Sequence, residues 1–100
     1  MCRRTKILEE RASRGLQAVI AAKPDWASKL RSATFTMLTS ENCMLGQVFG
    51  SFDKGLSALK LQQGPEAIEY GFQLSPKEMA EGWVQPWTQI WQEIVDLARH

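Results

Sequence analysis

Residues 42–61 constrain the fold most, because they combine a strong helical pattern with two glycines. One face of a helix through this segment is apolar and carries Leu45, Val48, Phe49, Phe52, Leu56 and Leu59. The opposite face carries small or neutral residues, which we assign structural roles: Cys43, Gly46, Gln47 and Gly50. Each glycine costs about 1 kcal/mol of helix propensity relative to alanine, so we expect another element to approach the backbone there. The segment predicts a central helix that packs on both sides and is bent or broken near residue 51.

Two longer amphipathic helices are predicted on either side of this segment. The first covers residues 5–22 and ends before Pro24, because the residue that precedes a proline disfavours helical geometry. The last begins near Pro86 and continues to residue 100, with large apolar side chains at three- and four-residue spacing. We therefore expect two helices that each bury one apolar stripe against the central segment.

Shorter elements are expected between these helices. Residues 26–31 predict a short helix, in which Trp26 closes one end of the core. The β-branched and aromatic residues of 33–38 predict a short strand or an extended segment. The fold class is thus mainly α: a small single-domain helical bundle with a central glycine-containing helix. One short β-pair between residues 34–38 and 70–74 is an additional prediction, and residues 1–4 of the single domain 1–100 are expected to fray.

The net charge of +1 is unevenly distributed along the chain. Residues 1–31 carry eight basic and three acidic side chains, whereas residues 32–100 carry four basic and eight acidic ones. We favour the interpretation that the two parts complement each other within one fold. The alternative is a basic surface that binds nucleic acid, with the following arginines as its contacts: Arg3, Arg4, Arg11 and Arg14.

The residue types needed for catalysis or metal binding are scarce. The two cysteines, Cys2 and Cys43, form neither a disulfide framework nor a zinc motif. A nucleophilic cysteine needs a base within hydrogen-bond reach, and the single histidine is His100. We therefore expect no enzyme activity, no metal and no cofactor. The absence of a signal peptide or an apolar run of about 20 residues predicts a cytoplasmic protein without membrane contact.

Four tryptophans in 100 residues are many, and three of them stand four residues apart near the end of the chain. Trp91 lies in the middle of the apolar stripe of the last helix, so we expect it in the core. Trp83 and Trp87 are the candidate partner-binding residues, because tryptophan is enriched in binding hot spots. An exposed tryptophan edge is the functional surface that this pattern indicates.

The chain also resembles a group of small uncharacterised proteins of actinobacteria and their bacteriophages. Trp26, Met37 and the run Cys43-Met44-Leu45-Gly46-Gln47-Val48-Phe49-Gly50-Ser51-Phe52-Asp53-Lys54-Gly55-Leu56 carry the resemblance, which extends over residues 24–98. The resemblance implies a phage or prophage origin, a bacterial host cell and no catalytic residues. We expect a non-enzymatic interaction protein that binds and modulates a host protein. A small nucleic-acid-binding accessory protein that uses the basic first third is the alternative.

Overall fold

The computed structural model describes residues 3–99, apart from the side chains of Arg3 and Ser32. Helices make up most of this part of the chain, and residues 3–99 contain no strand. The elements in order are α1 (Arg3–Ala22), α2 (Trp26–Lys29), a 3₁₀ helix (Ser32–Thr34), α3 (Met44–Phe49), α4 (Phe52–Leu59), α5 (Pro65–Glu69), α6 (Pro76–Ala80) and α7 (Val84–Arg99). The predicted mainly α fold class is confirmed.

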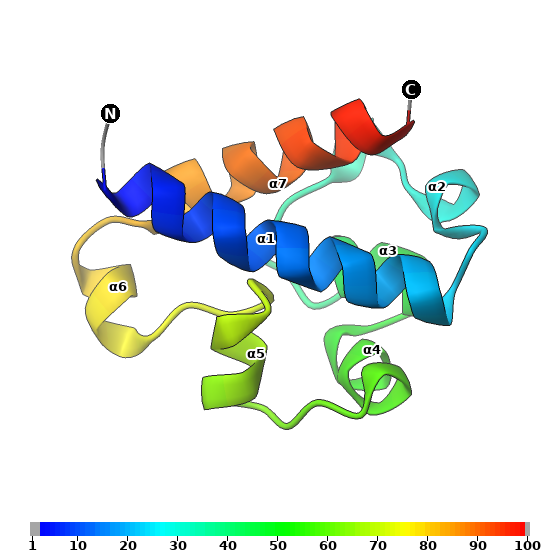
Figure 1. Ribbon diagram of the computed structural model, residues 1–100, viewed down its shortest axis with the longest axis horizontal. Coiled ribbons are helices and arrows are strands. Elements are labelled where there is room, and N and C mark those ends of the chain that lie inside the picture. Colours follow the sequence, from blue (N-terminus) through cyan, green and yellow to red (C-terminus); the bar gives the residue numbers. More distant parts are fainter. Residues whose placement is uncertain (1–2, 100) are drawn as a thin grey trace.

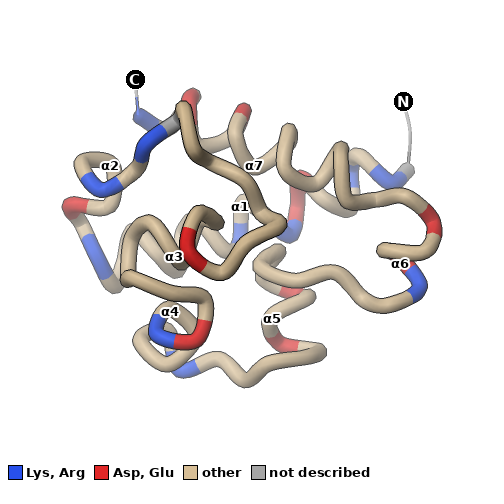
Figure 2. Tube along the Cα trace, turned by 180° about the vertical axis from the view of Figure 1, so that it is seen from behind, with Lys and Arg blue, Asp and Glu red and all other residues tan. Residues whose placement is uncertain are grey.

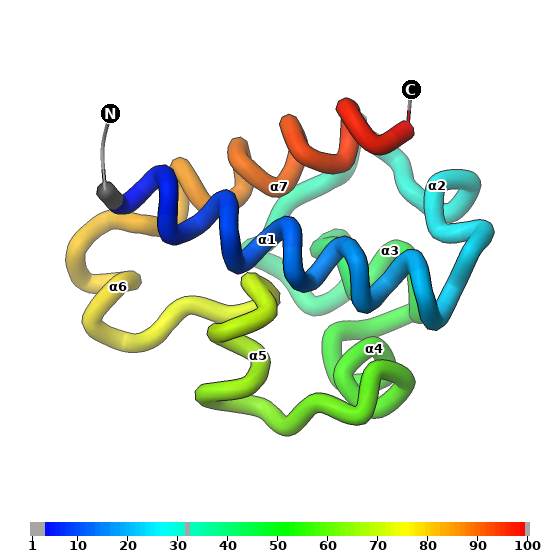
Figure 3. The backbone as a smooth tube through the Cα atoms, in the orientation of Figure 1, coloured from blue at the N-terminus to red at the C-terminus, as the bar shows by residue number. Residues whose placement is uncertain are grey.

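The two long helices lie side by side and form one layer of the molecule. Figure 1 shows α1 crossing the front with α7 above it, whereas α3, α4 and α5 lie behind or below α1. The smooth trace in Figure 3 shows α2 at one end of this arrangement and α6 at the other. Helices α3, α4 and α5 form the second layer, and the core lies between the two layers. Its largest completely buried side chains are Trp91, Leu8, Met44, Leu45 and Val19.

Helix α1 buries one apolar stripe, from which the apolar residue Ile20 is left out. Leu8, Ala12, Leu16 and Val19 are buried at three- and four-residue spacing, whereas Ile20 is 40% exposed. The helix begins at Arg3 rather than at Thr5 and ends at Ala22, as Pro24 predicts. Met1 and Cys2 lie outside the described residues, so the expected fraying of the terminus stays a prediction.

The central segment is divided into two helices at Gly50, which confirms the predicted break. Gly50 follows α3 with a φ of 106°, a conformation that suits glycine, and Ser51 then caps α4 by accepting a hydrogen bond from Lys54 N at 3.1 Å. Gly46 does permit a close approach, because a Cβ there would lie 2.3 Å from the carbonyl oxygen of Ser40. At Gly50 the expectation of a close approach is wrong, since only the side chain of Lys54 lies nearby.

The predicted β-pair between residues 34–38 and 70–74 is wrong. Residues 32–40, which we call the strap, start as a 3₁₀ helix and continue through turns towards α3. Two main-chain N–H groups of the strap donate to partners outside residues 70–74. Thr36 N donates to Asn42 O at 3.2 Å, and Met37 N donates to the Thr88 hydroxyl oxygen at 3.2 Å. The β-branched residues of the strap therefore follow tertiary contacts with α7 rather than their strand propensity.

The turn after α5 holds the two layers together. Gly71 has a φ of 80°, and its carbonyl oxygen accepts hydrogen bonds from the indole nitrogens of Trp87 at 2.9 Å and Trp91 at 2.6 Å. The Trp91 ring also stacks on Phe72 with centroids 5.4 Å apart. Gly15 makes this approach possible, because a Cβ there would lie 2.1 Å from the carbonyl oxygen of Tyr70. The turn thus contacts both α1 and α7.

Candidate functional site

The strap and the chain that follows Gly71 form walls of an open pocket of about 350 Å³. The pocket is completed by residues from the turn after α4, the α3–α4 region, α6 and α7. Its lining residues are Met37, Leu38, Thr39, Ser40, Cys43, Phe52, Gln63, Phe72, Gln73, Leu74, Met79 and Trp87. Two segments that a β-pair would have joined therefore stand apart, with a cavity between them.

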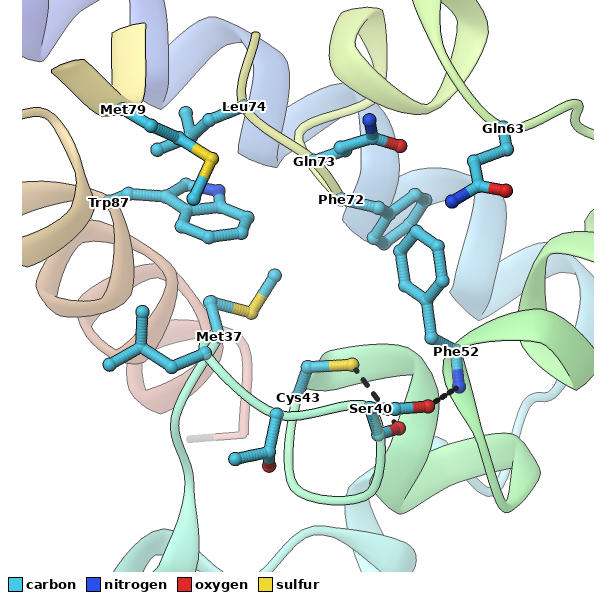
Figure 4. A pocket seen from close by; sticks show the side chains of 12 residues that line it. Met37, Ser40, Cys43, Phe52, Gln63, Phe72, Gln73, Leu74, Met79 and Trp87 are labelled. Atoms are coloured by element: carbon cyan, nitrogen blue, oxygen red, sulfur yellow. Dashed lines mark hydrogen bonds between the residues drawn. The ribbon is translucent and has the colours of Figure 1, made fainter. Parts of the chain in front are cut away.

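Aromatic rings and sulfur atoms make the inside of the pocket apolar. Figure 4 shows the rings of Phe52 and Phe72 facing each other, and the side chain of Met79 beside the indole of Trp87. Met37 points into the space between these two groups, and the sulfur of Cys43 points towards Ser40. Such surfaces accept apolar side chains readily, because methionine is flexible and its sulfur packs favourably on aromatic rings.

The thiol of Cys43 serves the local structure of the pocket wall. Cys43 precedes α3 and is 2% exposed, and its Sγ accepts a hydrogen bond from Gly46 N at 3.3 Å. Burial raises the pKa of this thiol above its ordinary value, although the hydrogen bond from Gly46 acts in the opposite direction. Because the thiolate is the nucleophilic form, a raised pKa makes Cys43 a poor nucleophile. Its burial agrees with the predicted structural role.

A second, shallower hollow of about 700 Å³ adjoins the pocket along α7. Leu38 and Met79 line both hollows and are 64% and 54% exposed, so they form an apolar ridge between them. The remaining residues of the second hollow are Thr36, Gly82, Val84, Gln85, Thr88, Gln89 and Gln92. We call the two hollows together the groove.

Among the residues that the structure describes, no Asp, Glu, Lys or Arg lines the groove, although charged residues make up 23% of the chain. Its walls come mainly from sequence runs without a charge: 32–40, 42–52, 70–76 and 82–92. Figure 2 shows the strap crossing this side of the molecule without a charged residue between Arg31 and Glu41. Five of the eight glutamines line the groove and give its rim amide donors and acceptors.

The structure does not present the tryptophans as an exposed edge. Trp87 is only 6% exposed, because its ring packs in the core and its indole nitrogen bonds to Gly71; the accessible part of the ring lines the pocket. Trp83 is half-buried, and the guanidinium groups of Arg4 and Arg11 lie 5.4 and 5.9 Å from its ring centroid. The exposed edge predicted from sequence is wrong for Trp87, and partner binding by Trp83 stays a prediction.

The basic residues proposed for nucleic-acid binding are engaged with other groups. Arg11 forms an ion pair with Glu78, with nitrogen–oxygen distances of 2.9 and 2.8 Å. Arg14 donates to the carbonyl oxygen of Glu69 at 2.9 Å and lies 3.6 Å from its carboxylate. Arg4 covers Trp83, and the side chain of Arg3 lies outside the described part. Nucleic-acid binding therefore stays a prediction. Glu78 and Glu69 already pair with two of the arginines that it would use, Arg11 and Arg14.

The other residues assigned structural roles in the sequence analysis are Trp26, Trp91 and Gln47. Trp26 is 6% exposed and Trp91 is completely buried. The Gln47 amide joins α3 to the chain around it: its Oε1 accepts from Arg31 N at 2.5 Å, and its Nε2 donates to the carbonyl oxygens of Arg31 at 3.2 Å and Asn42 at 3.0 Å. Gln47 therefore fixes both ends of the loop that contains the strap.

Apart from Trp87 and Cys43, sequence reasoning missed the groove residues, among which Leu38 and Met79 are the exposed large apolar side chains. Four uncharged runs in a chain with 23 charged residues were the available signal. Their convergence on one surface depends on how the strap folds against α7, which no local pattern in the sequence indicates.

Within residues 3–99 there is no group of three His, Cys, Asp or Glu side chains that could hold a metal ion. In the same part of the chain, no helix is both long enough and apolar enough to cross a membrane. Comparison of the chain with protein-family models, with curated proteins and with solved structures finds no match.

Proposed function

We propose that this protein is a non-enzymatic interaction protein that binds a partner protein through the groove. The observation that carries the proposal is the apolar ridge of Leu38 and Met79 between two hollows that, within the described part of the chain, contain no charged residue. Exposed apolar side chains beside a hollow and surrounded by polar groups are typical of protein–protein contact sites. The resemblance to proteins of actinobacteria and their phages supports a host protein in the cytoplasm as the partner.

The chemistry of the lining supports binding rather than catalysis. Among the described lining residues, the one thiol is that of Cys43, which has a raised pKa, and no carboxylate, lysine or histidine stands beside it. General acid–base catalysis needs such a group within hydrogen-bond reach of the reacting atom. Amides, hydroxyls and apolar side chains suit recognition, because they supply hydrogen bonds and contact area without a reactive centre.

Three single-residue variants test the proposal. Met79→Asp and Leu38→Asp place a charge on the ridge at positions that are already exposed, so both proteins should fold. Leu97→Asp is the matched control, because Leu97 is 79% exposed on α7 and lines neither hollow. Tagged versions are expressed in an actinobacterial host, and the proteins that copurify at stoichiometric amounts are compared between variants.

We expect the wild type and Leu97→Asp to recover the same partner, and both ridge variants to lose it. Burying a carboxylate in an uncharged site without a counter-ion strongly disfavours binding, which explains the expected loss. Equal recovery by all four proteins would contradict the proposal, because the partner would then bind elsewhere. Circular dichroism spectra of the variants verify that each one is folded.

A further inference from the structure

We infer that the groove binds an extended peptide segment of the partner that carries no charge and inserts one large apolar side chain into the pocket. The inference rests on the proposed function and adds the conformation and the chemistry of the bound segment. Three observations carry it: an unpaired buried main chain in the pocket wall, the absence of charge, and the aromatic lining.

The first observation concerns the main chain of Leu74. This residue is 3% exposed, yet within residues 3–99 neither its N–H nor its C=O has a hydrogen-bond partner. Buried main-chain groups are paired in the great majority of cases. Figure 4 shows that the chain from Phe72 to Leu74 runs along the edge of the pocket. An extended peptide in the pocket brings its own N–H and C=O groups to this edge, as a strand does when it adds to a sheet.

The second observation is the polar but uncharged rim. Gln63 and Gln73 stand at one end of the groove, and Gln85, Gln89 and Gln92 stand along the other. An amide side chain donates and accepts, and so matches both main-chain groups of a peptide. A charged side chain of the partner would instead lose its hydration without gaining a counter-ion. The bound segment therefore lacks Asp, Glu, Lys and Arg at the positions inside the groove.

The third observation is the lining of the pocket. Phe52, Phe72 and Trp87 offer aromatic surface, and Met37 and Met79 offer flexible side chains that adapt to what enters. A volume of about 350 Å³ lies within the range of protein ligand pockets. A phenylalanine, leucine or methionine side chain of the peptide fits this combination of shape and chemistry.

A displayed library of short linear peptides tests the inference. The library is selected on the wild-type protein and depleted on Met79→Asp, and Leu97→Asp is the control surface. We expect one large apolar residue at a fixed position, with charged residues depleted on both sides of it relative to the unselected library. Enrichment of charged residues around that position, or no peptide that distinguishes the wild type from Met79→Asp, would overturn the inference.

The best selected peptide is then synthesised in three forms, and each is titrated into the wild type by isothermal calorimetry. Methylation of a main-chain nitrogen next to the apolar residue should weaken binding about fivefold to tenfold, because it removes one hydrogen-bond donor. Replacing a neighbour of the apolar residue by glutamate should weaken binding at least as much. Equal affinities for the methylated and unmethylated peptides would show that the main chain is not recognised and would overturn the extended mode.

Three further outcomes separate the inference from the proposed function. If partner recovery depends on Met79 but no peptide is selected, the partner docks by a folded surface; the proposed function stands and this inference fails. If sedimentation shows a dimer of this chain that Met79→Asp dissociates, the occupant is a second copy and the inference also fails. If partner recovery is independent of Met79 and Leu38, the proposed function itself is wrong.

Discussion

A single carbonyl oxygen, that of Gly71, accepts hydrogen bonds from two tryptophans on successive turns of α7. Gly71 is itself fixed by its positive φ and by its contact with α1, where a Cβ would lie 2.9 Å from the main chain of Arg11 and Ala12. Any side chain at this position would separate α1 from the turn. One residue therefore connects α1, the pocket wall and α7.

The two indole hydrogen bonds should be coupled. Trp87→Phe or Trp91→Phe alone leaves the Gly71 carbonyl with one donor, whereas the double variant leaves a buried acceptor with none. An unsatisfied buried polar group costs about 1–3 kcal/mol, so the double variant should lose more stability than the two single variants together. Urea unfolding of the four proteins measures this difference. Additive losses, within about 0.5 kcal/mol, would show that the shared acceptor has no energetic importance.

Glu78 is a residue whose ionisation should affect stability. Desolvation by burial raises its pKa, but the hydrogen bonds and charge of Arg11 and the hydrogen bonds of Ser75 outweigh this effect. The pKa of Glu78 therefore lies below its ordinary value of 4.5 in the folded protein. A carboxylate with a lowered pKa stabilises the fold fully above that ordinary value, and the contribution is lost as the pH falls through the lowered pKa.

The Glu78→Gln variant tests this pH dependence. Glutamine can still serve in the capping box with Ser75, but it carries no charge for Arg11. Above the ordinary pKa we expect the wild type to be more stable than the variant, and below the lowered pKa we expect the difference to vanish. Denaturant unfolding at a series of pH values gives both curves. A difference that stays constant as the pH falls would rule out Glu78 as the titrating group.

At the scale of elements, the long helices were predictable and the strap was not. Helices α1 and α7 follow from apolar spacing, and the end of α1 follows from Pro24, because these signals are local. The strap depends on distant residues, since Thr88 accepts from Met37 N and Gln47 bonds to Arg31 and Asn42. A short segment with β-branched residues gives no indication of these partners, so its strand propensity was misleading.

The Gln47 side chain should control how firmly the strap is held. Gln47→Ala removes three hydrogen bonds to main-chain groups at the two ends of the loop. We expect a loss of about 1–3 kcal/mol in the free energy of unfolding and faster hydrogen exchange of the strap amides. Gln62→Ala is the control, because Gln62 is exposed. Unchanged exchange at Met37 and Leu38 in Gln47→Ala would show that α7 alone holds the strap.

At the scale of the whole molecule, charge is excluded from one region and spread over the rest. The ion pairs of Arg11 with Glu78 and of Arg14 with Glu69 join the basic first third to acidic residues that follow it. This agrees with the expectation that the two parts of the sequence complement each other. The location of the groove was not predictable from the sequence, because it results from the placement of several uncharged runs around one cavity.

Partner binding at the groove should be nearly independent of ionic strength. No charged residue among the described positions 3–99 lines the groove, so added salt has no ion pair to screen there. Raising the salt concentration from about 50 to 500 mM should change the dissociation constant by less than about twofold. Binding to nucleic acid through the arginines of α1 would instead weaken steeply with salt. A steep decrease in partner affinity would therefore point to the charged surface of α1.

The pairing of α1 with α7 has a consequence for the chain while it is being synthesised. Helix α1 ends at Ala22 and α7 starts at Val84, so the ribosome makes about 60 residues after α1 before its partner helix exists. At ordinary elongation rates this takes roughly 3 to 12 s. During that time the apolar stripe of α1 is without the helix that covers it, and the Gly71 carbonyl, once made, is without the two indole donors of α7. The nascent chain should therefore bind chaperones until α7 emerges and then fold in a single late step.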